Sequence, residues 1–174
     1  MKNERTQEYA NRLSRLLQKE TVTAGNLKDK NKFYEFQELL RELFPSIFSA
    51  CSFENFDGSF LMKWQGQGRG EPILIMNHQD VVEAPGAWKY PPFSGTIADG
   101  KVWGRGALDT KGGLWAMFQA ANELAATGYT PKRDVYFMST CTEESDGTGA
   151  DTISRALESR GLHFYMVLDE GGMI

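Results

Sequence analysis

"ILIMNHQDVVEAP", residues 73–85, decides the fold, because an apolar run ends abruptly there at a histidine and an aspartate. The run from Ile73 has the apolar character of a buried strand. His78 and Asp80 are two residues apart, so both face the same side of an extended segment. In open α/β sheets, ligands bind beyond the carboxyl ends of the strands. The stretch therefore predicts a buried strand that delivers two polar groups to a binding site.

Helical and strand patterns alternate along the rest of the chain. Amphipathic helices are predicted around Tyr9–Leu17 and Phe33–Leu43, with Pro45 ending the second one, and again over 113–126 and 150–159. Strands are predicted over 47–53, 59–65, 135–140 and 164–168. The proline-rich segment 84–100 reads as a surface excursion without long regular structure. This order predicts a three-layer α/β fold, in which a mostly parallel mixed sheet has helices on both faces.

Composition excludes several classes of function. The 174 residues carry a net charge of -4, and neither sign gathers into a block that would suit nucleic acid or anionic lipid. The N-terminal residues are too hydrophilic for a signal peptide, and no apolar run approaches the ~20 residues of a membrane span. We therefore expect a cytoplasmic protein with neither a nucleic-acid nor a membrane partner. Cys51 and Cys141 are too far apart to indicate a paired-cysteine metal site or a disulfide framework.

Acidic residues follow two further apolar runs. Glu143 and Glu144 come after the strand predicted at 135–140, and Asp169 and Glu170 come after the last one. Asp109 stands where a loop becomes a helix, close to a helix N-terminus that favours negative charge. Each feature is ordinary alone, since 23 acids in 174 residues give about three adjacent acidic pairs by chance. Together they place several carboxylates at one sheet edge, which is costly without a cation.

These residue types indicate a two-metal hydrolytic site. Imidazole and carboxylates without thiolates suit zinc, and also manganese or cobalt. We expect two ions to be held by His78, Asp109, Glu144 and one of Asp169 or Glu170, with Asp109 bridging. Asp80 would orient His78, and Glu143 would be the general base.

A nucleotide site is the weaker reading of "GRGALDTKGG", residues 104–113. A phosphate-binding loop would need Gly at Thr110 and Ser or Thr at Gly112, and Asp109 breaks the dinucleotide fingerprint. Lys111 and Arg105 are interpreted as local salt-bridge partners, and His163 as surface or core packing.

Four motifs together resemble a known family: "NHQDVVEAP", "WKYPPFSGTIADGKVWGRGALDTKGG", "STCTEESDGTGA" and "LDEGG". The chain resembles the di-zinc metallopeptidases that include aminoacylase, carboxypeptidase G, carboxypeptidase S and succinyl-diaminopimelate desuccinylase. The carboxypeptidase S-like branch is the nearest. The resemblance implies the zinc-dependent exopeptidase fold. It also implies zinc ligation by His78 and Glu144, a bridging Asp109 followed by a cis bond, Asp80 as orienting partner and Glu143 as base. For the remaining ligand it favours Glu170, with Asp169 as the alternative.

The resemblance also bears on domains and activity. It implies that residues 1–174 are the N-terminal part of a catalytic domain, truncated before a lid or dimerisation domain and a last His ligand. The expected activity is metal-dependent hydrolysis of an amide bond in a small peptide or an N-acyl amino acid, with two Zn²⁺, or Co²⁺ or Mn²⁺. This fragment alone would be inactive, and the full-length protein could be a homodimer. The alternatives are a non-catalytic binding module that keeps the fold and, less well supported, a nucleotide-binding protein. Substrate side-chain preference is not readable from the sequence.

Overall fold

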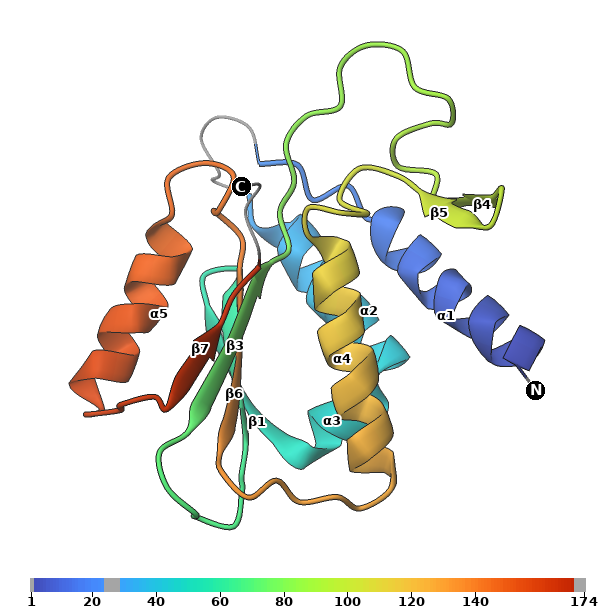
Figure 1. Cartoon of the computed structure of the whole chain (residues 1–174). Helices are drawn as coiled ribbons and strands as arrows, with labels where there is room; N and C mark the ends of the chain where they lie inside the picture. The colour runs from blue at the N-terminus through green and yellow to red at the C-terminus, as the bar shows by residue number, and fades with distance from the viewer. Residues whose placement is uncertain (1, 24–28, 171–174) are drawn as a thin grey trace.

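A five-stranded sheet forms the centre of the computed structural model, which describes residues 2–23 and 29–170 (Figure 1). The strand order is β1-β2-β6-β3-β7. The strands are β1 Cys51–Phe56, β2 Ser59–Trp64, β3 Ile73–His78, β6 Val135–Thr140 and β7 Met166–Leu168. The helices are α1 Lys2–Leu17, α2 Asn31–Leu43, α3 Pro45–Ala50, α4 Lys111–Ala126 and α5 Thr148–Ser159. A separate hairpin pairs β4 Thr96–Ala98 with β5 Lys101–Trp103.

Four of the five strands point the same way. β3 is parallel to both β6 and β7, whereas β2 is antiparallel to β1 and to β6. Only β2 therefore runs against the others, and the predicted mostly parallel mixed sheet is confirmed. Because β3, β6 and β7 are parallel, their carboxyl ends lie at one edge of the sheet.

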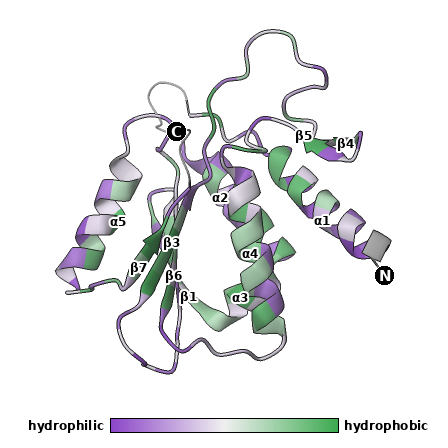
Figure 2. Ribbon diagram, viewed as in Figure 1, coloured by the Kyte–Doolittle hydropathy of each residue, from purple (hydrophilic) through white to green (hydrophobic). Residues whose placement is uncertain are grey.

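The two faces of the sheet are covered by different helices, as Figure 1 shows. Phe60, Met62 and Phe137 belong to the larger buried cluster, which α1 to α4 complete. Leu61 and Met138 belong to the smaller cluster on the α5 side. Alternate residues of one strand point to opposite faces, so the inner strands β3 and β6 are apolar over most of their length, and Figure 2 shows much of the sheet in green. The predicted three-layer arrangement is confirmed.

One predicted strand is wrong over most of its length. Residues 47–50 lie in the short helix α3, and β1 begins only at Cys51. Pro45 is tolerated at the start of a helix because its missing N–H has no partner there anyway. The side-chain oxygen of Asn122 accepts hydrogen bonds from the next two amides, those of Ser46 and Ile47, at 2.9 and 3.2 Å. A contact distant in sequence thus stabilises the helix.

Smaller differences concern the ends of elements. α4 begins two residues earlier than the predicted 113, and α5 begins two residues earlier than 150. β7 is shorter than the predicted 164–168. The proline-rich excursion leads directly into the β4–β5 hairpin. Within the described residues, no helix is long and apolar enough to cross a membrane.

Candidate metal centre

The predicted site residues meet at the carboxyl edge of the sheet. His78 is the last residue of β3, and Glu143 and Glu144 lie in the turn after β6. Glu170 follows β7, and Asp109 comes just before α4. Ligand atoms of His78, Asp109 and Glu144 lie within 4.8 Å of one another, and so do those of His78, Glu143 and Glu170. Residues up to 92 positions apart in the sequence (78 to 170) are thus brought around one imidazole.

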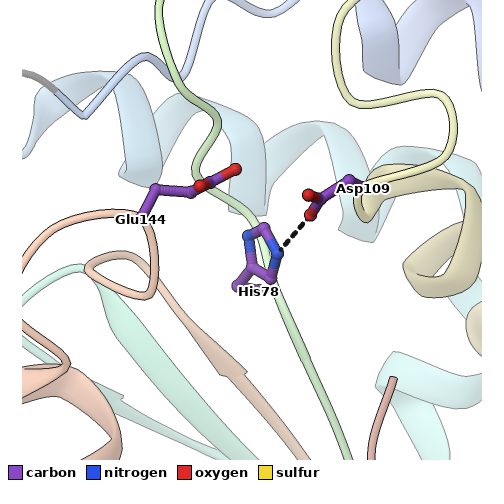
Figure 3. Close-up of side chains that lie close together, drawn as sticks. All are labelled: His78, Asp109 and Glu144. Atoms are coloured by element: carbon purple, nitrogen blue, oxygen red, sulfur yellow. Dashed lines mark hydrogen bonds and ion pairs between the residues drawn. The ribbon is translucent and has the colours of Figure 1, made fainter. Parts of the chain in front are cut away.

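The buried imidazole of His78 is the hub of this group (Figure 3). Its Nε2 lies 2.9 Å from Asp109 Oδ1, 3.3 Å from Glu170 Oε1 and 3.9 Å from Glu143 Oε2. Figure 3 shows Asp109 and Glu144 on either side of the ring, approaching from different segments. One nitrogen therefore faces several carboxylates that could share a cation with it.

Asp80 contacts both His78 and the turn that carries Glu143 and Glu144. It is fully buried, and the Nδ1 of His78 lies 2.9 Å from its main-chain oxygen and 3.5 Å from its carboxylate. The same carboxylate accepts hydrogen bonds from the amides of Glu143 and Glu144, at 3.3 and 3.0 Å. Sequence reasoning assigned Asp80 only the first contact. The structure adds a second one, which ties the turn after β6 to the end of β3.

The residues around Asp80 are supported in turn by the segment that follows α1. Val22 forms a parallel β-bridge with Val81. The main chains of residues 21 and 23 exchange hydrogen bonds with Val81, and the hydroxyl of Thr21 donates to the main-chain oxygen of Gln79 at 2.6 Å. We call residues 19–23 the brace segment. It fixes the chain on both sides of Asp80.

The charges of the site act strongly on its titratable groups. Burial alone would lower the pKa of His78, but the hydrogen bond to Asp80 and the charges of Glu170 and Asp80 outweigh burial and raise it to about 9. Burial raises the pKa of Glu143, and the charges of Glu170, Asp80 and Asp109 add to this against the opposing effect of His78. Burial and the charge of Asp109 raise the pKa of Glu144. The carboxylates therefore repel one another and attract protons.

A divalent cation fits this surplus of negative charge. In the described part of the chain, His78 is the only basic side chain within 4.0 Å of the carboxylates of Asp109, Glu143 and Glu170. Crowded carboxylates with a single imidazole are costly unless a positive charge is added. Oxygen and imidazole donors are the set that zinc, manganese and cobalt accept.

The acids after β7 differ in their positions. Glu170 is in one of the two ligand groups, whereas Asp169 is in neither of those found among the described residues. Asp169 instead accepts a hydrogen bond from the amide of Glu170 at 2.9 Å. This geometry favours Glu170 as the ligand. His163 is exposed, and the peptide bond between Asp109 and Thr110 is cis, as the resemblance implied.

Lys111 and Arg105 do not form the predicted salt bridges with any residue that the structure describes. Lys111 is fully buried and donates to the main-chain oxygens of Leu16 and Lys19. Burial lowers its pKa to about 7, although the charges of Asp80 and Glu20 oppose this. Arg105 donates to the main-chain oxygen of Glu83. A lysine buried in this way is unable to reach a phosphate, which argues against the nucleotide reading.

An open groove of ≈ 790 Å³ leads away from the centre. It lies between α4 and the strands β3 and β7. Thr110 and Glu170 line the end next to the candidate metal ligands, and Trp64 and Tyr129 line the far end. A small molecule could therefore reach the carboxylates from this side.

The sequence matches the family model "Peptidase family M20/M25/M40" over residues 74–173. The chain belongs to this family. The match contains every candidate ligand, so the predicted metallopeptidase family is confirmed.

Several curated relatives are also similar. The chain is 38% identical over 160 residues to the N-fatty-acyl-amino acid synthase/hydrolase of Homo sapiens. This alignment covers 88% of this chain and 32% of the relative. It is 36% identical over 152 residues to carboxypeptidase S of Saccharomyces cerevisiae, covering 80% of this chain and 26% of the relative. The chain thus spans about a third of the length of these relatives.

Solved structures share the fold at low sequence identity. Human carnosine dipeptidase 1 superposes with a TM-score of 0.81 at 17% identity, over 99% of this chain and 40% of the other. A metallo-carboxypeptidase of the M20 family from Sulfolobus solfataricus gives 0.73 at 22% identity, over 95% and 38%. The fold is therefore that of the M20 metallopeptidases.

Proposed function

We propose that the chain is part of an enzyme that hydrolyses an amide bond in a small peptide or an N-acyl amino acid. The carrying observation is the convergence of Asp109, Glu143, Glu144 and Glu170 on the buried imidazole of His78. The names of the similar proteins, an acyl-amino acid hydrolase and a carboxypeptidase, agree with this substrate class.

The ligands in this proposal are His78, Asp109, Glu144 and Glu170. They would hold two divalent ions, zinc being the best match to the donor set. Such ions act as Lewis acids on the scissile carbonyl and make water a better nucleophile. Asp109, whose carboxylate lies 2.9 Å from His78 and in one candidate ligand group with Glu144, would be the shared ligand.

Glu143 is the general base in this proposal. Its carboxylate reaches to 3.9 Å from the hub nitrogen of His78 and stays half exposed, so it can exchange protons with water and substrate. Burial and neighbouring charge raise its pKa, which makes it a stronger base than an ordinary surface glutamate. It would take a proton from the attacking water and give one to the leaving amine. Asp80 holds both His78 and the turn that carries Glu143.

We further propose that residues 1–174 are the N-terminal part of the catalytic domain. The matched relatives are about three times as long, and the resemblance implies a further His ligand and a lid outside these residues. The isolated 174-residue chain is then expected to bind metal but not to hydrolyse amides. Hydrolysis by this chain, at a rate proportional to its concentration, would contradict this part of the proposal. A homodimer of the full-length protein and a cytoplasmic location stay predictions from the sequence.

Zinc titration of the isolated chain tests the metal centre. Asp109→Ala and Glu144→Ala are each expected to abolish the tightest binding event in a calorimetric titration. The matched control is Glu158→Ala, which removes an exposed acid on α5, on the other face of the sheet. Glu143→Gln should keep zinc binding while abolishing turnover in the full-length enzyme. Equal zinc binding by all four variants would exclude the proposed ligand set.

A further inference from the structure

Lys111 is an unusual residue to find without any exposed surface. It is the first residue of α4 and comes two positions after Asp109. Its side chain is 0% exposed, and in an ordinary protein a fully buried lysine requires a specific partner. The mechanism proposed above assigns it no role.

The partners of Lys111 lie at the C-terminal end of α1. Its Nζ donates to the main-chain oxygen of Leu16 at 3.3 Å and to that of Lys19 at 2.5 Å. It also lies 5.1 Å from the ring centre of Phe36. The last carbonyls of a helix have no partner within the helix, and a lysine placed there satisfies them. Both protonation states of a lysine amine donate hydrogen bonds, so these contacts do not depend on its charge.

Lys19 is also the first residue of the brace segment. From residue 21 onward the brace segment pairs with residues 79–81, which contain Asp80. The brace segment therefore contacts residues 79–81, which support His78, and also contacts Lys111, which follows the Asp109–Thr110 bond. His78 and Asp109 come from different segments of the chain, and the brace segment contacts both segments.

We propose that Lys111 is a positioning residue, which anchors residues 106–113 to the end of α1 and so sets where Asp109 stands relative to His78. This inference rests on the proposed function in one respect, namely that Asp109 is a metal ligand. Close packing around the anchor supports it, since a Cβ added at Gly106 would lie 2.9 Å from Val81 and 3.3 Å from the Lys111 side chain. The loop before Asp109 is thus packed against both Val81 and the side chain of Lys111.

Lys111→Met tests this role, because methionine fills a similar volume without donating hydrogen bonds. Lys111→Gln is the second variant, which keeps a polar group that is too short to reach both oxygens. The control is Leu157→Ala, which removes a buried side chain of α5 from the smaller core cluster and so destabilises the protein far from the site. All variants are compared at equal fractions of folded protein.

Amide hydrogen exchange without metal is the first measurement. The amides of Gly112 and Leu114, which donate to Gly106 and Thr110, report on the anchored segment. We expect them to exchange at least about tenfold faster in Lys111→Met than in the control, with the amides of α5 unchanged. Exchange equal to the control at these amides would overturn the proposal. Failure of both Lys111 variants to fold would also overturn it, since the role would then be general stability.

Cobalt(II) absorption is the second measurement, with the metal alone as the probe. Lys111→Met is expected to weaken cobalt binding about tenfold or more and to change the visible spectrum, as loss of support behind a ligand does. A spectrum and affinity equal to those of Leu157→Ala would overturn the proposal. If the parent chain itself binds no cobalt, the proposed metal function fails, and the exchange measurement still decides whether Lys111 anchors the segment.

Discussion

The carboxyl ends of β3 and β7 carry the same kind of residues in very different surroundings. Both strands are apolar runs that end in or are followed by candidate metal ligands. At the end of β3, His78 is 1% exposed and Asp80 is 0% exposed, and both have hydrogen-bond partners. β7 is an edge strand, and its three residues are 44–53% exposed. The difference teaches that packing fixes the side chains of the candidate metal site at the inner strand β3, whereas at the edge strand the structure leaves the candidate ligand less constrained.

Replacing Asp80 tests the β3 side with the largest expected effect. Asp80→Ala removes a buried acceptor from the amides of Glu143 and Glu144, and it removes the carboxylate that lies 3.5 Å from Nδ1 of His78, which keeps only the main-chain oxygen of residue 80 as its partner. We expect a loss of about 3 kcal/mol in the free energy of unfolding, measured with urea, together with loss of zinc binding. The exposed-site variant Glu158→Ala should change both little. If Asp80→Ala costs no more than Glu158→Ala, the account of the β3 side is wrong.

A pair of directly opposed residues compares the two strands themselves. Leu74 of β3 is 5% exposed and is paired with Val167 of β7, which is 53% exposed. Leu74→Ala is expected to lower the free energy of unfolding by about 3 kcal/mol. Val167→Ala should cost less than about 1 kcal/mol, as partly exposed positions do. Similar losses for the two variants in urea unfolding would show that β7 is as tightly packed as β3.

The pH dependence of zinc binding tests the charge at the hub. Because the pKa of His78 is raised to about 9, the metal-free imidazole is protonated at neutral pH and must lose its proton to bind zinc. Zinc affinity should therefore rise about tenfold per pH unit between pH 6.5 and 8.5, with about one proton released on binding. Calorimetry in buffers of different ionisation enthalpy measures that proton. If the zinc affinity does not change over this pH range, His78 is already neutral or is not a ligand.

The smallest expected effect is at the edge strand. Glu170→Ala should weaken zinc binding but leave the urea midpoint almost unchanged, because residue 170 is exposed and follows an edge strand. Asp169→Ala should change neither, since Asp169 is in neither ligand group among the described residues. The opposite ranking of the two variants in zinc affinity would assign the ligand to Asp169.

The same contrast explains what the sequence could predict. The strand at 135–140 and the strand ends that carry His78 and Glu144 follow from apolar runs that stop at polar residues, whereas Asp109 follows from its place where a loop becomes a helix. The pattern could not decide between Asp169 and Glu170, because adjacent residues after a strand reach the same edge and only coordinates separate them.

Long-range contacts account for the other errors. Residues 47–50 looked like a strand because nothing local shows that Asn122 caps a helix there. Lys111 was interpreted as a surface-type ion-pairing residue, because the periodicity of α4 does not reveal that α1 ends against it. In each case a partner distant in sequence determines the outcome.

The most direct test is an anomalous scattering measurement at the zinc edge on crystals of the chain grown with zinc. The account predicts an anomalous peak within about 2.0–2.2 Å of Nε2 of His78 and of oxygens of the surrounding carboxylates, with Asp109 among the ligands. Full zinc occupancy elsewhere on the protein, with no peak beside His78, would contradict it.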